Sequence, residues 1–471
     1  MTANIFFGSN EEKREDLQSI VNPYSQEVVS QYPMCTKEDT QKALEIAKKA
    51  SVQTKASNLS QRVAWLEDVV KKLKINKEDM AKTLCDEVGK PITFARVEVD
   101  RCIETVSLSI HAMINLDGHT MNTDAMPSGK KTLAYYKHVP VGVVACITPF
   151  NFPLNLVAHK IAPALVAGNA VVLKPTPEAP LSAYKFAKLF IESEFAIKDA
   201  LSLVYGDVEV GSTLVESMIP RVLSFTGSVP VGNIITKSAG IKKVSLELGG
   251  NAATFIDRSA DIKNAATRCA FGAFINSGQV CISLQRIYVD VSIYDEFANA
   301  LKIETEKLIV GSPYDDNTFI GPLINDESLQ RAKSWVQSAI DEGATCLTGN
   351  KNEGLNYYPT VMTNVTDDMK IVCEEVFAPI VSLVAVKNYD EAIEKMNNSP
   401  YGLQFSIFTN NLSQTKSFID DADCGGVVIN DIPTLRFDIQ PYGGNKLSGI
   451  GKEGPKFALE EFTEIKSVVI A

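Results

Sequence analysis

The sequence predicts an α/β protein that contains parallel β-sheet. From about Pro140 onward, short apolar segments alternate with segments of about a dozen residues that have helical apolar spacing. This alternation is typical of βαβ units, which build parallel sheets. The composition is that of a globular protein, with 45% hydrophobic and 22% charged residues. At roughly 150 residues per domain, a chain of 471 residues suggests about three domains.

The segment before Pro140 is predicted to be mainly helical. Apolar residues recur at helical spacing within residues 37–49, 59–88 and 95–115. Residues 121–131 are polar and are interrupted by Pro127 and Gly129, whereas residues 133–138 alternate like a strand. We therefore interpret residues 121–139 as an excursion between two parts of one domain.

The strands and helices of the first α/β series follow in order. Strands are expected at residues 141–147, 170–173, 201–205, 222–225, 244–248 and 253–256. Helices are expected at residues 153–166, 181–192 and 228–239. A second series runs from a helix at residues 265–274 to the neighbourhood of Ile429. A glycine-rich stretch at residues 443–454 and a strand-like tail at residues 467–471 complete the pattern.

Charge and composition disfavour several classes of function. The formal net charge of −11 argues against a nucleic-acid-binding surface. No run of about 18 apolar residues occurs, so no membrane span is expected, and residues 1–14 show no secretory signal. The nine cysteines include no C-x-x-C pair, which argues against a disulfide framework and a structural zinc site. We expect a cytoplasmic protein with reduced thiols and no bound metal.

Two glycine-containing segments could bind a phosphate. Residues 449–454 match G-x-G-x-x-G, but no strand is expected before them, proline follows directly, and too few residues remain for a βαβ unit. The Gly227-Ser228 turn is the better candidate, because an apolar strand ends there and a helix with open amides begins. An ordinary capped turn would have the same sequence pattern.

Four polar residues could perform chemistry. Cys281 lies among small and polar residues, which suits a nucleophilic thiol, although a core cysteine is the ordinary alternative. Glu247 stands between two leucines, where desolvation would raise its pKa and fit it for general-base work; the alternative is an edge-strand residue facing water. Asn151 could donate to an oxyanion, or could be an ordinary turn residue. Lys174, at the end of a strand, could bind a ribose or phosphate, or could be solvated.

Seven segments, taken together, resemble the NAD(P)-dependent aldehyde dehydrogenase superfamily. In order, they are Pro149-Phe-Asn-Phe-Pro153, Lys174-Pro175, Phe225-Thr-Gly-Ser228, Leu246-Glu-Leu-Gly-Gly250, Gly278-Gln-Val-Cys281, Glu374-Glu-Val-Phe377, and Pro441-Tyr-Gly-Gly444 with Lys446, Ser448 and Gly449. Each segment is a weak signal alone. Their common order over nearly the whole chain, and the spacing between Glu247 and Cys281, make the resemblance specific.

The resemblance implies a three-part α/β fold. A Rossmann-like cofactor domain would comprise residues 1–120 and 140–248, and an α/β catalytic domain would comprise residues 249–440. A small β oligomerisation element would comprise residues 121–139 and 455–471. The resemblance also implies a homodimer or homotetramer.

The resemblance further implies the chemistry. Cys281 would attack a small aldehyde to form a thiohemiacetal, and Asn151 would hold the oxyanion. Hydride would pass to NAD, and Glu247 would then activate water to hydrolyse the thioester. The residues expected to bind the cofactor are Lys174, Gly227, Ser228, Phe150, Glu375 and Phe377.

Several residues depart from the usual family pattern. Pro177 stands where many NAD-preferring members have a glutamate, so we predict that NADP is accepted beside NAD. His159 stands where many members have a tryptophan in the substrate tunnel, which would make the tunnel wall more polar. Residues 430–444 are similar to the lactaldehyde and glyceraldehyde dehydrogenase branch. Within them, Arg436 could hold a polar group of a short aldehyde, or could form a surface ion pair. We therefore expect an α-hydroxyaldehyde such as lactaldehyde as substrate.

Two alternatives remain open at this stage. One is an aldehyde dehydrogenase that transfers the acyl group to CoA, but members of that group generally lack the glutamate that corresponds to Glu247. The other is a non-catalytic binding protein of the same fold. The presence of Cys281, Glu247 and Asn151 together argues against it.

Overall fold

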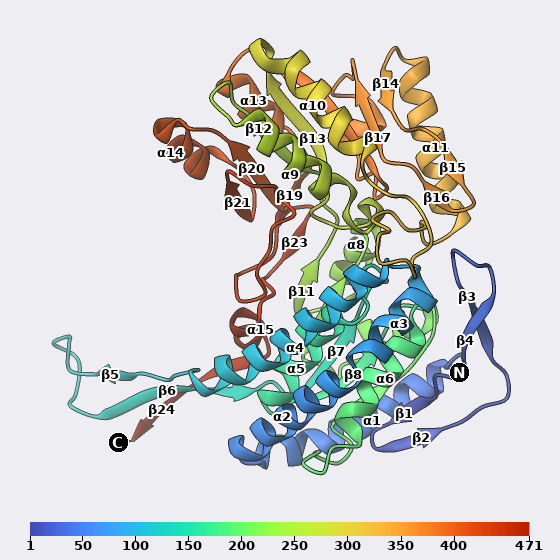
Figure 1. Ribbon diagram of the computed structural model, residues 1–471. Coiled ribbons are helices and arrows are strands. Elements are labelled where there is room, and N and C mark those ends of the chain that lie inside the picture. The colour runs from blue at the N-terminus through green and yellow to red at the C-terminus, as the bar shows by residue number, and fades with distance from the viewer. Residues whose placement is uncertain (471) are drawn as a thin grey trace.

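A computed structural model describes residues 1–470 of the chain (Figure 1). Two large sheets, each flanked by helices, form the two main parts of the molecule, and a three-stranded sheet projects to one side of the first. The α/β fold expected from the sequence is confirmed. The tail strand was expected to include Ala471, which lies outside the described residues. No helix within residues 1–470 is long and apolar enough to cross a membrane.

The first large sheet has the strand order β2-β1-β9-β8-β7-β10-β11-β23. Its strands are β1 (Ile5–Phe7), β2 (Asn10–Glu12), β7 (Val143–Ile147), β8 (Ala170–Lys174), β9 (Leu201–Leu203), β10 (Val222–Thr226), β11 (Lys243–Glu247) and β23 (Gly449–Ile450). Strands β7 to β11 are parallel, and the strand order reverses between β7 and β10. Ligands of such open sheets bind beyond the carboxyl ends of the strands at the reversal. The segments that follow β7, β8, β10 and β11 are therefore the place to look for a site.

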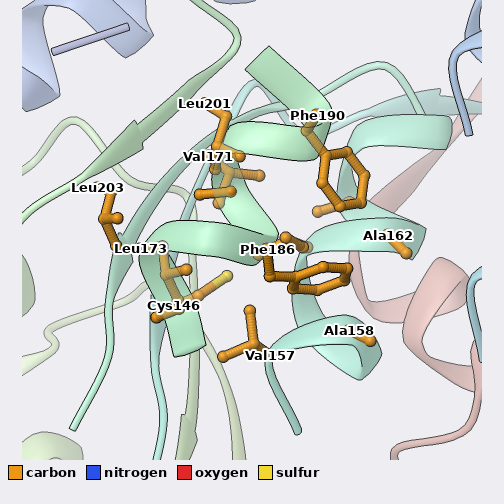
Figure 2. Close-up of a cluster of buried hydrophobic side chains, with 14 of the residues drawn as sticks. Cys146, Val157, Ala158, Ala162, Val171, Leu173, Phe186, Phe190, Leu201 and Leu203 are labelled. Carbon is orange, nitrogen blue, oxygen red and sulfur yellow. The ribbon is translucent and has the colours of Figure 1, made fainter. Parts of the chain in front are cut away.

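Helices cover this sheet and form one large core with it. They are α1 (Lys37–Ala56), α2 (Leu59–Ile75), α3 (Lys77–Val88), α4 (Ile92–Ile114), α5 (Asn155–Val166), α6 (Pro180–Ile191), α7 (Val208–Glu216) and α8 (Val229–Ser238). Figure 2 shows Phe186 and Phe190 of α6 in one buried cluster with Val157 of α5 and with Val171 and Leu173 of β8. Because the parallel strands are buried between helices, they are mainly apolar, which is why the sequence revealed them.

The second large sheet has the order β14-β17-β18-β13-β12-β20-β21. Its strands are β12 (Ala252–Ile256), β13 (Leu284–Asp290), β14 (Thr345–Thr348), β17 (Thr360–Thr363), β18 (Ile380–Val386), β20 (Gln404–Phe408) and β21 (Gly426–Ile429). Its helices are α9 (Ile262–Phe274), α10 (Tyr294–Glu306), α11 (Asp326–Asp341), α12 (Lys370–Cys373), α13 (Tyr389–Asn397) and α14 (Leu412–Asp421). In β13, Ile287 and Val289 join one buried cluster while Tyr288 joins another, so helices cover both faces.

The projecting sheet contains β5 (Thr120–Asn122), β6 (Leu133–Pro140) and β24 (Thr463–Ile470), the last preceded by α15 (Pro455–Glu461). Strands β6 and β24 pair antiparallel from Leu133 opposite Ile470 to Pro140 opposite Thr463. Leu133, Ile465 and Val469 are each more than half exposed. A projecting strand pair with exposed apolar side chains is typical of a surface that another chain covers.

The remaining elements are small. They are the strand pairs β3 (Gln18–Val21) with β4 (Val28–Tyr32), β15 (Asn352–Glu353) with β16 (Asn356–Tyr357), and β19 (Tyr401–Gly402) with β22 (Asn445–Lys446), and the 3₁₀ turns η1 (Ile275–Gly278) and η2 (Val291–Ile293).

The structure corrects several element boundaries. The helical run expected over residues 59–88 divides at Asn76 into α2 and α3. The sequence did not predict β1 to β5 or α7. No strand was predicted within the glycine-rich stretch, but β23 lies within it. This strand pairs antiparallel with the end of β11, with Gly449 opposite Glu247.

Candidate active site

A cavity of about 150 Å³ is lined by side chains that come from both halves of the chain. Cys281, Glu247 and Asn151, the three predicted catalytic residues, all line it. So do Arg436, one of the two predicted substrate-binding residues, and Tyr442, which the sequence analysis did not single out. The structure therefore brings together a thiol, a carboxyl group, an amide and a cation that are far apart in sequence.

The backbone before Cys281 is sharply turned. Asn276 and Ser277 both have positive φ angles, of 51° and 56°. A side chain on Gly278, whose φ is 69°, would lie 2.2 Å from the carbonyl oxygen of Ala378, so only glycine fits there. The turn ends α9 and its 3₁₀ extension and directs the next residues, including Cys281, toward the cavity.

The thiol of Cys281 is a hydrogen-bonding partner of Tyr442, with Sγ and Oη 2.8 Å apart. Burial raises the pKa of Cys281 to about 12, and the contact with Tyr442 and the charge of Arg436 oppose this rise. The thiol is therefore protonated at neutral pH, so a nucleophilic attack requires that its proton be transferred to another group.

Glu247 ends strand β11 and is 2% exposed. Both of its carboxyl oxygens are buried without a hydrogen-bond partner among residues 1–470. A side chain on Gly443 would lie 2.5 Å from Oε1, so glycine allows the chain to pass this close. Burial, together with the nearby charge of Glu453, raises the pKa of Glu247 well above its usual value. A carboxyl group with a raised pKa can take a proton from water near neutral pH.

Asn151 follows strand β7 and joins the two halves of the site. Its backbone oxygen accepts hydrogen bonds from Lys90 Nζ at 2.7 Å and from Asn276 Nδ2 at 3.3 Å. Its side-chain oxygen accepts from the backbone N–H of Phe152 at 3.1 Å. Because Oδ1 is occupied in this way, the orientation of the amide is set and Nδ2 is left as a donor for the cavity.

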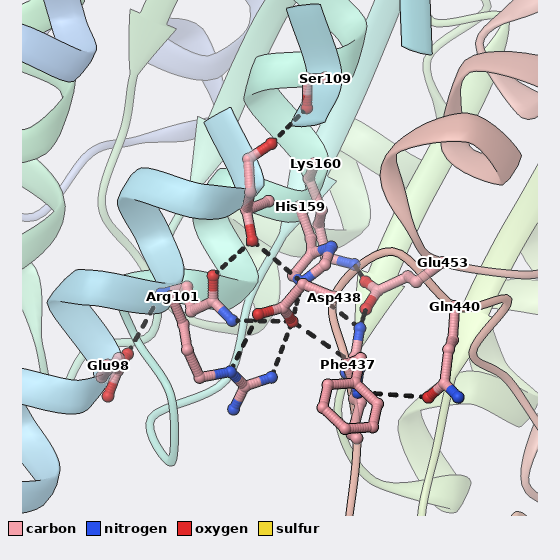
Figure 3. Close-up of polar contacts among 12 residues, drawn as sticks. Glu98, Arg101, Ser109, His159, Lys160, Phe437, Asp438, Gln440 and Glu453 are labelled. Atoms are coloured by element: carbon pink, nitrogen blue, oxygen red, sulfur yellow. Dashed lines mark hydrogen bonds and ion pairs between the residues drawn. The ribbon is translucent and has the colours of Figure 1, made fainter. Parts of the chain in front are cut away.

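A cluster of buried charges lies beside the cavity (Figure 3). Lys160 Nζ is 2.6 Å from Glu453 Oε1. Although burial alone would raise it, the positive neighbours, chiefly Lys160, lower the pKa of Glu453 to about 2. Arg101 donates twice to Asp438, at 2.7 and 3.0 Å, and His159 Nε2 lies 2.9 Å from the same carboxylate.

The structure separates the two residues expected to face the substrate. The guanidinium carbon of Arg436 lies 3.6 Å from the ring centre of Tyr442, on the cavity wall, and the side chain is 9% exposed. Arg436 is therefore not a surface residue. His159 is fully buried and does not line the cavity, which corrects the expectation that it forms part of the tunnel wall. It lies behind Arg436, with Nε2 3.4 Å from Arg436 Nη2, because Asp438 covers this side of α5.

Lys174 and the Gly227-Ser228 turn lie beyond the carboxyl ends of β8 and β10. The ammonium group of Lys174, on a side chain that is 7% exposed, donates to no acceptor among the described residues. Ser228 begins α8 without a side-chain cap hydrogen bond, so the first amides of the helix remain open. Ribose hydroxyls and a pyrophosphate would supply the missing acceptors, so these residues fit a dinucleotide.

Glu375 and Phe377 approach this region from the second half of the chain. Glu375 Oε1 accepts from the backbone N–H of Gly250 at 2.9 Å, and burial raises the pKa of Glu375 to about 7. The ring of Phe377 lies 5.9 Å from that of Phe150, nearly perpendicular to it. The structure thus brings Phe150 and Phe377, from the two halves of the chain, together. No group of three or more His, Cys, Asp or Glu side chains within residues 1–470 is placed to hold a metal ion.

Comparison with known proteins agrees with this arrangement. The model of the aldehyde dehydrogenase family matches residues 9–468. The chain belongs to the aldehyde dehydrogenase family. The resemblance inferred from seven short segments is thereby confirmed.

Relatives within the family are similar over almost their whole length. A 3-sulfolactaldehyde dehydrogenase of Priestia aryabhattai is 43% identical, over 96% of this chain and 94% of the relative. A lactaldehyde dehydrogenase of Methanocaldococcus jannaschii is 40% identical, over 97% of this chain and 98% of the relative. The glyceraldehyde-3-phosphate dehydrogenase of the same organism, solved in complex with NADP, has a TM-score of 0.92 and 39% identity, over 98% of this chain and 100% of the solved one.

Sequence reasoning missed several residues of this aldehyde dehydrogenase site. Tyr442 was read as part of a Pro-Tyr-Gly-Gly motif and Glu453 as part of a glycine-rich stretch. Lys160 and Glu453 are 293 positions apart, and Arg101 and Asp438 are 337 apart, so no local pattern links them. A charged residue within the otherwise apolar helix α5 was the one available signal, and it applies to Lys160.

We expect Tyr442→Phe to slow alkylation of Cys281 by iodoacetamide about fivefold at pH 8, because it removes a hydrogen bond worth about 1 kcal/mol that lowers the thiol pKa. The rate is measured by mass spectrometry of the peptide that contains Cys281. The partly exposed Cys346, which contacts Thr348 instead, is the internal control. Equal rates at Cys281 in both proteins would show that Tyr442 does not act on the thiol.

Proposed function

We propose that this protein oxidises a small aldehyde, in particular an α-hydroxyaldehyde such as lactaldehyde, to the carboxylic acid with NAD or NADP. The observation that supports this most directly is the single cavity lined by Cys281, Glu247, Asn151 and Arg436. It holds a nucleophile, a base and an oxyanion donor for the chemistry, and a cation for a polar substrate. The family membership supports the same reaction.

In the first step, Cys281 Sγ forms a bond to the carbonyl carbon of the aldehyde, the thiol proton is released to solvent, and the second bond between the carbonyl carbon and oxygen breaks. The carbonyl oxygen becomes negatively charged, and Asn151 Nδ2, held by the hydrogen bond at Oδ1, donates to it. Because the cavity is small and partly apolar, this donor acts in a medium of low dielectric constant, where it stabilises the oxyanion more than it would in water.

The cofactor supplies a hydride acceptor when it is bound, so that the substrate carbon is left at the oxidation level of a thioester. We assign its binding to Lys174 and Ser228 for the ribose and phosphates, with Gly227 allowing close approach. Glu375 is assigned to the ribose next to the nicotinamide, and Phe150 and Phe377 are assigned to the region around the nicotinamide ring. The unpaired ammonium of Lys174 and the open amides of α8 support this assignment.

In the last step, the ionised form of Glu247 takes a proton from a water molecule that attacks the thioester carbon, and Cys281 leaves as the thiolate, which then regains a proton from solvent. Glu453 is a poor base for this step because Lys160 holds it as a carboxylate with a pKa of about 2. Glu247 has no cation in hydrogen-bond contact, which leaves its oxygens available.

The substrate class is supported by relatives and by the polar part of the cavity. The relatives named above include two that are called lactaldehyde or 3-sulfolactaldehyde dehydrogenases. Arg436 lines the cavity and is assigned to the polar end of the substrate, with His159 positioned behind it. Polar groups in a pocket discriminate strongly against analogues that leave them unpaired.

We also propose that the chain forms a homodimer or homotetramer through residues 121–139 and 455–471. The exposed apolar side chains of β6 and β24 support this role. The cofactor domain is assigned to residues 1–120 and 140–248 and the catalytic domain to residues 249–440. Nine free cysteines fit a reducing, cytoplasmic location, with neither nucleic acid nor membrane as a partner.

Glu247→Gln keeps the shape of the side chain and removes its basicity. We expect a burst of about one NADH per site followed by steady-state turnover at least 100-fold slower, because acylation persists and thioester hydrolysis does not. Stopped-flow absorbance at the NADH band measures both phases. Cys281→Ala, the matched control, should give neither burst nor turnover. Unchanged turnover by Glu247→Gln would remove this residue from the mechanism.

We expect kcat/KM for lactaldehyde and glyceraldehyde to exceed that for propanal at least tenfold, because only the hydroxyaldehydes satisfy the polar groups of the cavity. NADH or NADPH formation is followed with each substrate and both cofactors. Equal values for lactaldehyde and propanal would leave a general aldehyde dehydrogenase and would contradict the hydroxyaldehyde assignment.

A further inference from the structure

Arg436 lines the active-site cavity without a close acceptor for its charge. Its Nε is buried and has no hydrogen-bond partner among residues 1–470. The nearest carboxylate oxygens belong to Glu453, 3.6 Å from Nη2, and to Asp438, 4.0 Å from Nε. The remaining polar contact is with His159, at 3.4 Å. A guanidinium group offers five N–H donors, so most of those of Arg436 remain available.

The two neighbouring carboxylates are already paired with other cations. Asp438 accepts from Arg101 at 2.7 and 3.0 Å, and Glu453 contacts Lys160 at 2.6 Å. These are charge-assisted contacts of ordinary length, whereas the distances to Arg436 are too long for strong hydrogen bonds. Arg436 is thus the cation of the cluster that lacks a carboxylate of its own. A buried cation in that situation is strongly stabilised by an incoming anion.

The distance between Arg436 and the nucleophile is set by one side chain. The guanidinium group of Arg436 stacks on the ring of Tyr442, with its carbon 3.6 Å from the ring centre, and the hydroxyl group of the same tyrosine lies 2.8 Å from Cys281 Sγ. A ligand whose carbonyl carbon meets Sγ therefore needs only a short chain to place a second group against Arg436.

A depression next to the cavity shares arginine side chains with it. Arg101 and Arg436 both line the cavity and also a neighbouring depression of about 660 Å³, which Phe437 and Ile439 border. Arg101 is about one quarter exposed. Glu104 and Asp438 also line this depression, and Arg101 is paired with Asp438, so Arg436 is the arginine shared with the cavity that lacks a close carboxylate.

We propose that the aldehyde substrate of this site carries an anionic group, a carboxylate, sulfonate or phosphate two or three atoms from the carbonyl carbon, and that Arg436 binds this group. The inference rests on the proposed function and specifies its substrate class. Carboxylates, sulfonates and phosphates share the oxygen geometry that a guanidinium fork recognises. A neutral hydroxyaldehyde offers Arg436 a hydroxyl group as a hydrogen-bond acceptor but leaves its positive charge without an anionic partner.

Matched pairs of substrates test this directly. The pairs are glyceraldehyde 3-phosphate with glyceraldehyde, 3-sulfolactaldehyde with lactaldehyde, and succinate semialdehyde with pentanal. We expect kcat/KM for the anionic member of at least one pair to exceed that of the neutral member by at least tenfold in the parent enzyme. In Arg436→Met the ratio should fall about 100-fold, and in Arg436→Lys it should fall less. The pair with the largest ratio identifies the anion.

The matched control is Arg96→Gln, which removes an exposed arginine paired with Glu78 and Asp316 outside the cavity. It should leave every ratio unchanged. A second readout does not depend on turnover. In Cys281→Ala, calorimetry should show 3-phosphoglycerate binding at least tenfold more tightly than glycerate, and Arg436→Met should remove the difference.

The outcomes separate the two proposals. If the kcat/KM ratios of anionic to neutral substrates are near one in the parent enzyme, or are unaffected by Arg436→Met, the proposed anion site is overturned. The proposed function still stands in that case if lactaldehyde and glyceraldehyde are good substrates. If no aldehyde is oxidised, the proposed function fails, and the calorimetry alone decides whether Arg436 binds an anion.

Discussion

Two carboxyl groups, those of Glu247 and Glu453, are buried beside the same small cavity, and their pKa values are shifted in opposite directions. One lysine is the chief cause of the downward shift. Lys160 contacts Glu453 at 2.6 Å and fixes the negative charge there, so that burial and this neighbouring charge both favour the neutral form of Glu247. Like charges in a medium of low dielectric constant cannot both ionise easily. Cys281 and Arg436 line the same cavity as these two carboxyl groups.

The fold imposes the arrangement through the last part of the chain. After the second sheet is complete, the chain returns to the first sheet, where β23 pairs with the end of β11 and places Gly449 opposite Glu247. On the way it passes Glu247 at Gly443 and supplies Arg436 and Tyr442 to the cavity, and just after β23 it supplies Glu453. Cys281 comes from the turn after α9, and Asn151 from the end of β7. The reacting groups therefore depend on the docking of the two halves, which Lys90 and Asn276 stabilise by binding the same carbonyl oxygen of Asn151.

The parallel strands of the first sheet could be predicted because each is a mainly apolar segment between helices. Strands such as β1 and β23 could not, because they have two or three residues and pair with strands that are distant in sequence, β9 and β11. Cys281, Glu247 and Asn151 were recognisable from the residues next to them in sequence. The position of His159 behind Arg436 was not, because it depends on Asp438, which is 279 positions away. For the same reason the sequence left open whether Arg436 is a surface residue or part of the site.

The protonation state of Glu247 in the resting protein tests this account most directly. Infrared difference spectra of the parent protein against Glu247→Gln isolate the carbonyl stretch of this one carboxyl group from those of Glu87 and Glu375, whose pKa values burial also raises to about 7. The account predicts a protonated carboxyl band in the difference spectrum that titrates well above the ordinary glutamate pKa of about 4.3, because burial and the charge of Glu453 favour the neutral form. A band that titrates near that ordinary value would contradict it.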